Sequence, residues 1–193
     1  VVLDPRARVP PSRSAGGLPA PVVLAAMLTV VSDTHGTGGH RLEGRTLDAV
    51  READAVVHAG DFMTESVLDA FQAEASRLYG VVGNNDRPAV RDRLPTQRVV
   101  EHEGFRLVVV HGHEHTDTAL SLLGRQEAAD LVVFGHSHRP GVHEGDGVTL
   151  LNPGSHAQPR RYRPAHAELE AVGDTVEGQL VDPDGTVFET FTI

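Results

Sequence analysis

Short apolar runs alternate with segments of helical character along the first half of the chain. The runs cover residues 28–31, 55–58 and 78–82, and each contains Val beside other apolar residues, as buried strands do. Two helical segments, 46–52 and 64–74, lie between them. This order predicts β-α-β-α-β, a pattern that is typical of an α/β domain.

The second half of the chain predicts more strands than helices. Its last three strands are separated by Gly-Asp and Asp-Gly turns, which is typical of an antiparallel meander. We expect strands at 97–101, 106–110, 131–134, 148–151, 165–171, 175–181 and 187–193, and one helix at about 118–129. The simplest architecture is two sheets packed face to face, with helices outside.

Polar residues gather directly after five of the apolar runs. Each cluster then lies in a loop at the carboxyl end of a predicted strand, the edge of an open α/β sheet where ligands bind. The clusters are D-T-H at 33–35, G-D at 60–61, G-N-N-D at 83–86, H-G-H at 111–113 and G-H-S-H at 135–138.

The residue types in these clusters suit a metal site. Residues i and i+2 of an extended chain point to the same side, so Asp33 and His35 can reach one ion, as can His136 and His138. The chain has no Cys, so the ligands must be His, Asp, Glu or Asn, a set that suits manganese, iron, nickel or zinc. Glycines next to the clusters let backbone pass close to a crowded site.

The five clusters resemble, in order, the signature of the calcineurin-like metallophosphoesterases, which reads D-x-H, G-D, G-N-x-D/E, H and G-H-x-H. The resemblance runs from about residue 28 to 159. It is greatest to the small bacterial and archaeal phosphodiesterase branch, because L-N-P-G-S at 151–155 and the short chain also fit that group. The resemblance implies a four-layer α/β sandwich in which two packed mixed β-sheets are flanked by helices.

The same resemblance implies two divalent metal ions per chain, with manganese as the first choice and nickel, iron or zinc as alternatives. One ion would be held by Asp33, His35, Asp61 and His138, and the other by Asp61, Asn84, His111 and His136. Asp61 would bridge the ions, and a shared hydroxide would attack phosphorus, so Asp61, Asn84 and His111 also count as catalytic.

The chain departs from the signature directly after the Asn ligand. Many relatives carry a proton-donating His there, whereas this chain has Asn85, and an amide cannot act as a general acid near neutral pH. His113 is an alternative proton donor. Asp86 is expected to orient a metal-bound group, and Arg160 to meet a substrate phosphate.

Several other residues are weaker candidates. His156 and Arg161 follow the 152–155 turn and could contact substrate, while His58 is expected to hydrogen-bond in the core. The histidines without an expected role are placed at the surface: His40, His102, His143 and His166.

The sequence favours a phosphodiesterase that acts on small-molecule or nucleotide-like diesters. A phosphomonoesterase would use the same ligands. A noncatalytic scaffold of the same fold is a further alternative, represented by a membrane-trafficking subunit that resembles these enzymes. Scaffolds tend to lose ligands, and none of the seven is missing here.

Composition argues against nucleic acid as a partner, which leaves a small phosphate ester as the expected substrate. The 27 Asp and Glu outnumber the 17 Arg, and the chain has no Lys and a net charge of -10, which argues against stable nucleic-acid binding. The late strands offer an edge through which a homodimer could form.

The first 26 residues are rich in Pro, Arg, Ser and Gly, and predict a disordered arm before a domain at 27–193. Met27 is an alternative start of translation. No apolar run is long enough to span a bilayer, and the run at 22–31 leads into the first cluster without a cleavage site. We therefore expect a cytoplasmic protein without a membrane partner.

Overall fold

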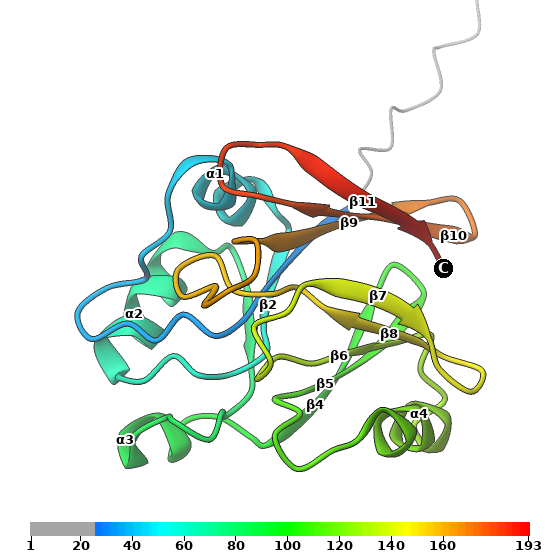
Figure 1. Cartoon of the computed structure of the whole chain (residues 1–193), viewed down its shortest axis with the longest axis horizontal. Helices are drawn as coiled ribbons and strands as arrows, with labels where there is room; N and C mark the ends of the chain where they lie inside the picture. Colours follow the sequence, from blue (N-terminus) through cyan, green and yellow to red (C-terminus); the bar gives the residue numbers. More distant parts are fainter. Residues whose placement is uncertain (1–25) are drawn as a thin grey trace, which may run out of the picture.

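The computed structural model describes residues 26–193, so the arm predicted at 1–26 lies outside the described residues except for Ala26. One of its two sheets has six strands in the order β11-β10-β9-β1-β2-β3 (Figure 1). The first three strands in the chain run parallel, and the last three form the predicted antiparallel meander. The bounds are β1 (Met27–Val31), β2 (Ala55–His58), β3 (Leu78–Gly80), β9 (His166–Val172), β10 (Thr175–Val181) and β11 (Val187–Thr192).

The second sheet has five strands in the order β4-β5-β6-β8-β7. Its three central strands are parallel, and the two edge strands are antiparallel to their neighbours. The bounds are β4 (Gln97–His102), β5 (Phe105–Val110), β6 (Leu131–Val133), β7 (Gly141–Glu144) and β8 (Thr149–Asn152).

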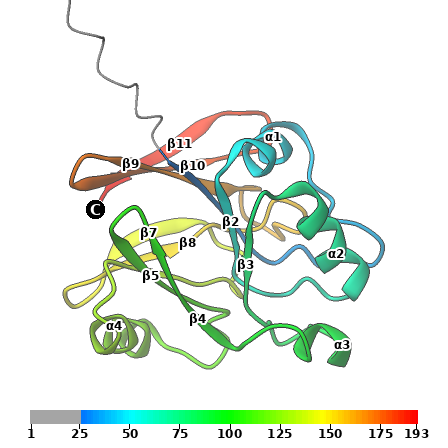
Figure 2. The ribbon, with the colours of Figure 1, turned by 180° about the vertical axis from the view of Figure 1, so that it is seen from behind.

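Helices lie on the outer sides of both sheets (Figure 2). Apolar side chains of α1 (Gly44–Glu52), α2 (Glu65–Glu74) and α3 (Pro88–Arg91) share a core cluster with β1 and β2, and α4 (Asp117–Gln126) packs on the five-stranded sheet. A third cluster fills the space between the sheets. The predicted sandwich of two mixed sheets flanked by helices is confirmed. None of the described helices is long and apolar enough to cross a membrane.

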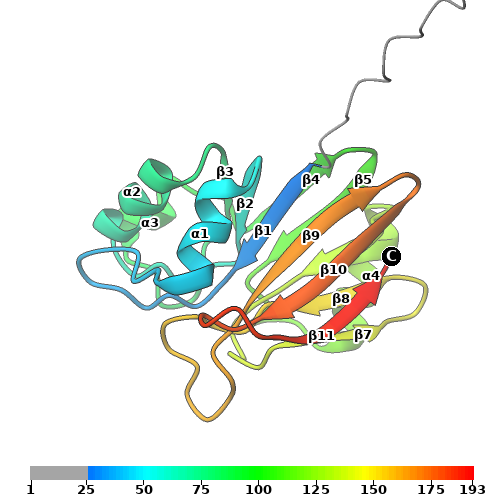
Figure 3. The same cartoon turned by 90° about the horizontal axis from the view of Figure 1, so that it is seen from above.

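The structure differs from the prediction in short elements and boundaries. Strand β7 and helix α3 were not predicted, because each has only four residues and too few apolar positions to show a period. Helix α4 ends three residues before the predicted end at 129, and β3 ends at Gly80. No described helix lies over the outer face of β10 and β11 (Figure 3), which carries polar residues such as Glu177. Helix α1 contacts the neighbouring strand β9 through Arg45 and Thr46.

The loops that carry the polar clusters meet at one end of the sandwich. Asp33 N–H donates to Gly60 O at 3.0 Å, joining the loops after β1 and β2, and Gly135 N–H donates to His111 O at 3.0 Å, joining those after β5 and β6. His136 N–H donates to Asp33 Oδ2 at 2.9 Å and so links the two sheets. The predicted convergence of loops is therefore present.

Candidate metal centre

Four of the seven predicted ligands form a buried floor. Asp33, Asp61, His111 and His138 are each at most 1% exposed. The other three face solvent to a greater extent: His35, Asn84 and His136. Burying two carboxylates is costly unless a counter-charge lies beside them.

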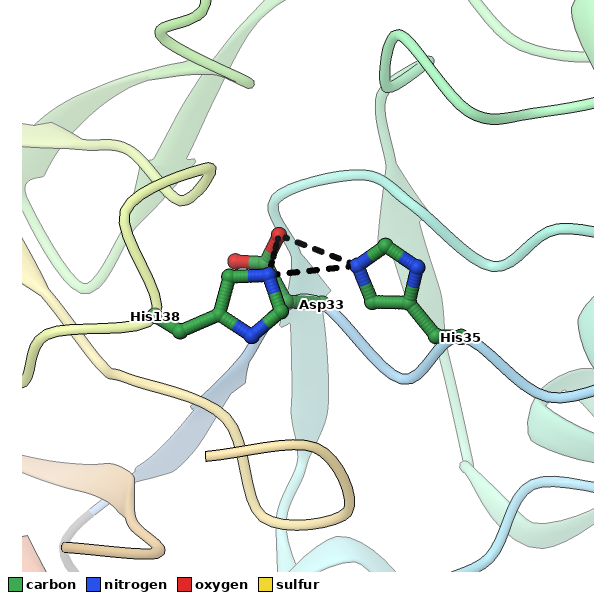
Figure 4. Close-up of side chains that lie close together, drawn as sticks. All are labelled: Asp33, His35 and His138. Carbon is green, nitrogen blue, oxygen red and sulfur yellow. Dashed lines mark hydrogen bonds and ion pairs between the residues drawn. The ribbon is translucent and has the colours of Figure 1, made fainter. Parts of the chain in front are cut away.

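Asp33, His35 and His138 form the first group (Figure 4). The Nε2 atoms of the two imidazoles are 3.2 Å apart, and Asp33 Oδ1 lies 3.4 Å from that of His138 and 3.7 Å from that of His35. Asp33 Oδ1 is buried and has no hydrogen-bond partner among the described residues. An orphaned carboxylate oxygen facing two imidazole nitrogens fits a cation bound among them.

His111, His136 and Asn84 form the second group. Asn84 Oδ1 lies 3.0 Å from His111 Nε2 and 3.0 Å from His136 Nδ1. Asp61 stands between the groups, because its Oδ2 is 3.3 Å from Nε2 of His35 and 3.3 Å from Nε2 of His111. The structure therefore brings all seven predicted ligands together.

Asp33 also lies near the second group. Ligand atoms of Asp33, Asp61 and His111 lie within 4.8 Å of one another, whereas the resemblance assigned Asp33 to one ion only. This proximity does not change the central position of Asp61, whose oxygen is equally far from one imidazole of each group.

Backbone carbonyls set the tautomers of two imidazoles. His111 Nδ1 donates to Ala59 O at 2.7 Å, and His138 Nδ1 donates to Gln158 O. In a neutral imidazole the other nitrogen, Nε2, then carries a lone pair. Both lone pairs point at carboxylate or amide oxygens, which are also acceptors. A divalent cation between these atoms would remove the repulsion by binding to all of them.

The protonation states also suit metal binding. Burial raises the pKa of Asp61, but hydrogen bonds from His111 and Asn85 outweigh it and hold the pKa well below its usual value. Burial lowers the pKa of His136 and of His138. Metal ligation requires ionised carboxylates and neutral imidazoles, and these three shifts favour that state. Burial lowers the pKa of His111, but its hydrogen bond to Asp61 outweighs this and raises the pKa, so metal binding would displace a proton from His111.

Asn85 and Asp86, which follow the predicted ligand Asn84, hold the buried ligands in place. Asn85 donates its N–H to Asp61 Oδ1 at 2.8 Å and its Nδ2 to Oδ2 at 2.7 Å. Asp86 accepts from the N–H groups of Gly83 at 2.7 Å, Met63 at 2.6 Å and Asp61 at 3.2 Å, and burial raises its pKa. Asp86 thus fixes the backbone on both sides of Asp61, and Asn85 fixes the Asp61 side chain; the role of Asp86 toward a metal-bound group stays a prediction.

The backbone of the centre is strained. Non-glycine residues rarely adopt a positive φ, yet Asp33 has a φ of 53°, Asp61 of 62° and His138 of 60°. His35 and His136 have φ values of 47° and 65°. Strain of this kind persists where surrounding contacts impose it, and it is frequent at functional sites.

Two glycines are required by close approach. A Cβ on Gly83 would lie 2.1 Å from Asp61 Oδ1, and one on Gly135 would lie 1.9 Å from Ser32 Oγ. Neither position has room for any side chain. These glycines thus let the backbone pass close to the crowded centre, as the sequence predicts, because a side chain would collide there.

The remaining predicted site residues lie at the edge of the centre. The His113 ring centroid is 5.5 Å from that of His111 and 6.1 Å from that of His136. Arg160 and Arg161 line a hollow with Ser137, the residue between His136 and His138.

Two sequence-based placements are wrong. His156 is buried, its Nε2 is 3.2 Å from His40 O, and its ring packs edge-on against Phe71 on α2 instead of reaching substrate. His166, expected at the surface, is fully buried, because its ring nitrogens bond to Thr46 and Glu168. His156 lies in the loop between β8 and β9 and His166 at the first position of β9, and no local pattern reveals that α2 and α1 pack against these rings.

His58 is in the core, as expected. It accepts at Nδ1 from Gly60 N–H at 3.2 Å, so its Nε2–H donates to Thr34 Oγ1 at 2.9 Å. Its ring stacks on Phe62 at 3.6 Å between centroids.

Sequence reasoning missed several residues that support Asp33 and its neighbours in the centre. Ser32 Oγ donates to its Oδ2 and Ser155 Oγ to its backbone O, both at 2.7 Å, and Asn152 Nδ2 donates to Gly135 O at 2.8 Å. The polar residues of L-N-P-G-S at 151–155 were a signal for the last two. No sequence signal could identify the carbonyls of Ala59 and Gln158 as acceptors, since every residue has a backbone carbonyl.

Comparisons with known proteins agree with this geometry. The model of the calcineurin-like phosphoesterase superfamily domain matches residues 27–174. A probable metallophosphoesterase of Methanothermobacter thermautotrophicus is 31% identical over 159 residues, which cover 80% of this chain and 91% of the relative. A phosphodiesterase of Methanocaldococcus jannaschii is 25% identical over 136 residues, covering 65% of this chain and 81% of the relative.

Among solved structures, a single mutant of Vps29 from Entamoeba histolytica is similar with a TM-score of 0.71 and 22% identity. The match covers 86% of this chain and 99% of that one. At this identity the similarity concerns the fold alone.

Proposed function

The chain belongs to the calcineurin-like phosphoesterase superfamily, and we propose that it is a phosphodiesterase that hydrolyses small-molecule or nucleotide-like diesters with two divalent metal ions. One observation supports this most: seven ligand side chains from five loops converge, and the buried Oδ1 of Asp33 has no hydrogen-bond partner among residues 26–193. Packing alone gives no reason for such a convergence of acceptors.

The residues present fit two ions. Asp33, His35 and His138 would hold one, Asn84, His111 and His136 the other, and Asp61 both. Two such ions, when bound, supply the Lewis acidity that activates a water and neutralises the phosphoryl oxygens. Asn85 keeps both Asp61 oxygens oriented.

Manganese is our first choice of metal, with nickel, iron or zinc as alternatives, because imidazole and carboxylate ligands suit all four. Metal analysis of the purified protein, followed by reconstitution of chelator-treated protein with each ion, tests this choice. Two ions per chain are expected.

The name of the Methanocaldococcus relative supports a diester over a monoester. The test compares bis(p-nitrophenyl) phosphate with p-nitrophenyl phosphate on the reconstituted protein. We expect a higher kcat/KM for the diester. A higher value for the monoester would favour a phosphomonoesterase, and bound metal without turnover of either would favour a noncatalytic scaffold.

We also propose a homodimer formed through β11, the edge strand of the described six-stranded sheet, where Val187 is 44% exposed, since an edge strand can pair with a second copy. Light scattering that gives the mass of one chain would contradict it. The cytoplasmic location stays a prediction, which cell fractionation tests.

A further inference from the structure

Three arginines beside the centre have no carboxylate partner among the described residues: Arg139, Arg160 and Arg161. Acidic side chains are in excess in this chain, 27 against 17 Arg. The arginines that form ion pairs with Asp or Glu are Arg45, Arg51, Arg93, Arg106, Arg125 and Arg163. The other described arginines without such a pair are Arg41, Arg77, Arg87, Arg91 and Arg98. Arg160 and Arg161 differ from these because they line one hollow together with Ser137, which lies between two predicted ligands.

The segment between β8 and β9, which protrudes at the bottom of Figure 3, is fixed to the floor of the centre. Ser155 Oγ donates to Asp33 O at 2.7 Å, and Gln158 O accepts from His138 Nδ1. Arg160 follows two residues later and has a φ of 56°. Its position is thus set by contacts with two predicted ligands.

A hollow of about 380 Å³ opens at this point, lined by Ser137, Arg160, Arg161 and Tyr162. The guanidinium of Arg161 lies 5.3 Å from the Tyr162 ring centroid and donates to its hydroxyl at 3.2 Å. That hydrogen bond, together with the charges of Arg161, Arg139 and Arg160, lowers the pKa of Tyr162. One guanidinium, that of Arg161, therefore contacts the phenol, and those of Arg139 and Arg160 act on it through their charge.

We propose that Arg139, Arg160 and Arg161 bind a second anionic group of the substrate, a phosphate or carboxylate that a short linker separates from the scissile phosphorus. This inference rests on the proposed phosphodiesterase function, and it names the substrate class as diesters with an additional negative charge. Guanidinium groups match phosphate and carboxylate in bidentate geometry. The predicted ligands would hold the scissile phosphate through metal, which leaves these arginines for the rest of the substrate.

The first test uses two diesters with the same leaving group, p-nitrophenyl propyl phosphate and p-nitrophenyl 2-carboxyethyl phosphate. We expect kcat/KM to be at least about tenfold higher for the carboxylate, the effect of one charge-assisted contact. In Arg160→Gln/Arg161→Gln this ratio should fall to about one. The control Arg51→Gln/Arg125→Gln removes the same charge from distant exposed sites and should keep the ratio.

A ratio unaffected by Arg160→Gln/Arg161→Gln would overturn the proposal, because the arginines would then act on both diesters alike. A ratio lost equally in the control would also overturn it, since net charge would be the cause.

The second test does not need turnover. Inorganic phosphate is titrated into metal-free protein by calorimetry, and saturable binding is expected in the millimolar range. Arg160→Gln/Arg161→Gln should weaken it at least about tenfold, an effect expected from losing a charge-assisted contact. Phosphate binding without hydrolysis of any diester would refute the phosphodiesterase but support the anion site, whereas no binding, or equal binding by the variant, would refute the site.

Discussion

Asp61 stands where the two groups of ligand atoms meet, within 3.3 Å of an imidazole nitrogen in each. Its ionised state depends on hydrogen bonds that outweigh the cost of burial. Substitutions at Asp61, at Asn85, which donates to it, and at Gly83, which packs against it, test whether Asp61 bridges two metal ions.

Asp61→Asn should lower the occupancy of both metal sites. The amide keeps the shape of the side chain but removes the negative charge that would attract both ions. We expect kcat/KM to fall more than about 100-fold, beyond the range typical of outer-shell changes. Elemental analysis of the purified variant measures the metal content. Asp69→Asn, an exposed carboxylate on α2, serves as control, and full occupancy in Asp61→Asn would refute the two-metal assignment.

Asn85 tests whether the centre lacks a proton donor at the position where relatives carry His. Asn85→Ala removes one hydrogen bond to Asp61, so activity should fall by about tenfold or less. Loss of a general acid would cost about 10²- to 10⁴-fold. Asn85→Asp should be far more damaging, because it places a second carboxylate where the amide donated to Asp61 Oδ2 at 2.7 Å.

Leaving-group dependence gives a second measurement on the same residue. Without an internal acid, turnover should fall steeply as the leaving alcohol becomes less acidic. A shallow dependence that disappears in His113→Ala would show instead that His113 supplies the proton.

Gly83→Ala should damage the centre through contact alone. The new Cβ would lie 2.1 Å from Asp61 Oδ1 and 2.3 Å from Asp61 N, so the bridging side chain must move. Metal content and kcat/KM should both fall, by at least about tenfold for a displaced ligand. Gly141→Ala is the matched control, since its Cβ meets nothing within 4 Å. Equal behaviour of the two variants would contradict this steric argument.

At the scale of elements, a buried polar network joins α1 to β9 on the outer face of the six-stranded sheet. Glu168 on β9 is 3% exposed and accepts two hydrogen bonds from Arg45 on α1, at 2.8 and 2.7 Å. His166 Nε2 lies 2.9 Å from Glu168 Oε1, and its Nδ1 lies 3.0 Å from Thr46 Oγ1. The network thus links the helix-covered part of the sheet to β9, the first strand of the meander.

Glu168→Gln should lower the free energy of unfolding at pH 7 by about 2 kcal/mol. This loss is smaller than that expected for breaking a fully buried ion pair, because Arg45 is partly exposed to solvent. Burial raises the pKa of Glu168, but the hydrogen bonds from His166 and Arg45 outweigh it and lower the pKa to about 2 from 4.5. A carboxyl with a lowered pKa stabilises the fold above its unfolded value and loses this effect as the pH falls.

The difference between wild type and Glu168→Gln should thus be constant above about pH 5 and shrink between pH 4.5 and about 2. Urea denaturation at several pH values measures it. Glu170→Gln, on the same face of β9, should change stability by less than about 0.5 kcal/mol. A difference independent of pH would mean that the charge of Glu168 is not responsible.

At the scale of the whole molecule, the core, the network and the centre are all built from residues 27 onward. A chain that begins at Met27 should therefore keep its metal content and activity. It loses one described backbone bond, from Ala171 N–H to Ala26 O, so its Tm should fall by less than about 4 °C. An insoluble or metal-free truncated protein would show that the first 26 residues are required.

The sequence by itself determined most of the segments that become strands, and which polar clusters follow them. Apolar runs located the strands that carry the centre, and each run ended at a polar cluster, because a buried strand must stop where charged groups require solvent or a counter-ion. The ligand types followed from the same clusters. The sequence did not reveal β7 and α3, because these four-residue elements have few apolar residues, whereas the equally short β2 is mostly apolar.

Only the tertiary structure decided how distant residues meet. Asp33 accepts from His136 N–H across 103 positions, and His138 depends on the carbonyl of Gln158. The burial of His166 and the unpaired arginines around Tyr162 likewise follow from which loops and helices become neighbours. A local pattern reports whether a side chain prefers water or the core, whereas its partner is set by strand order and long-range packing.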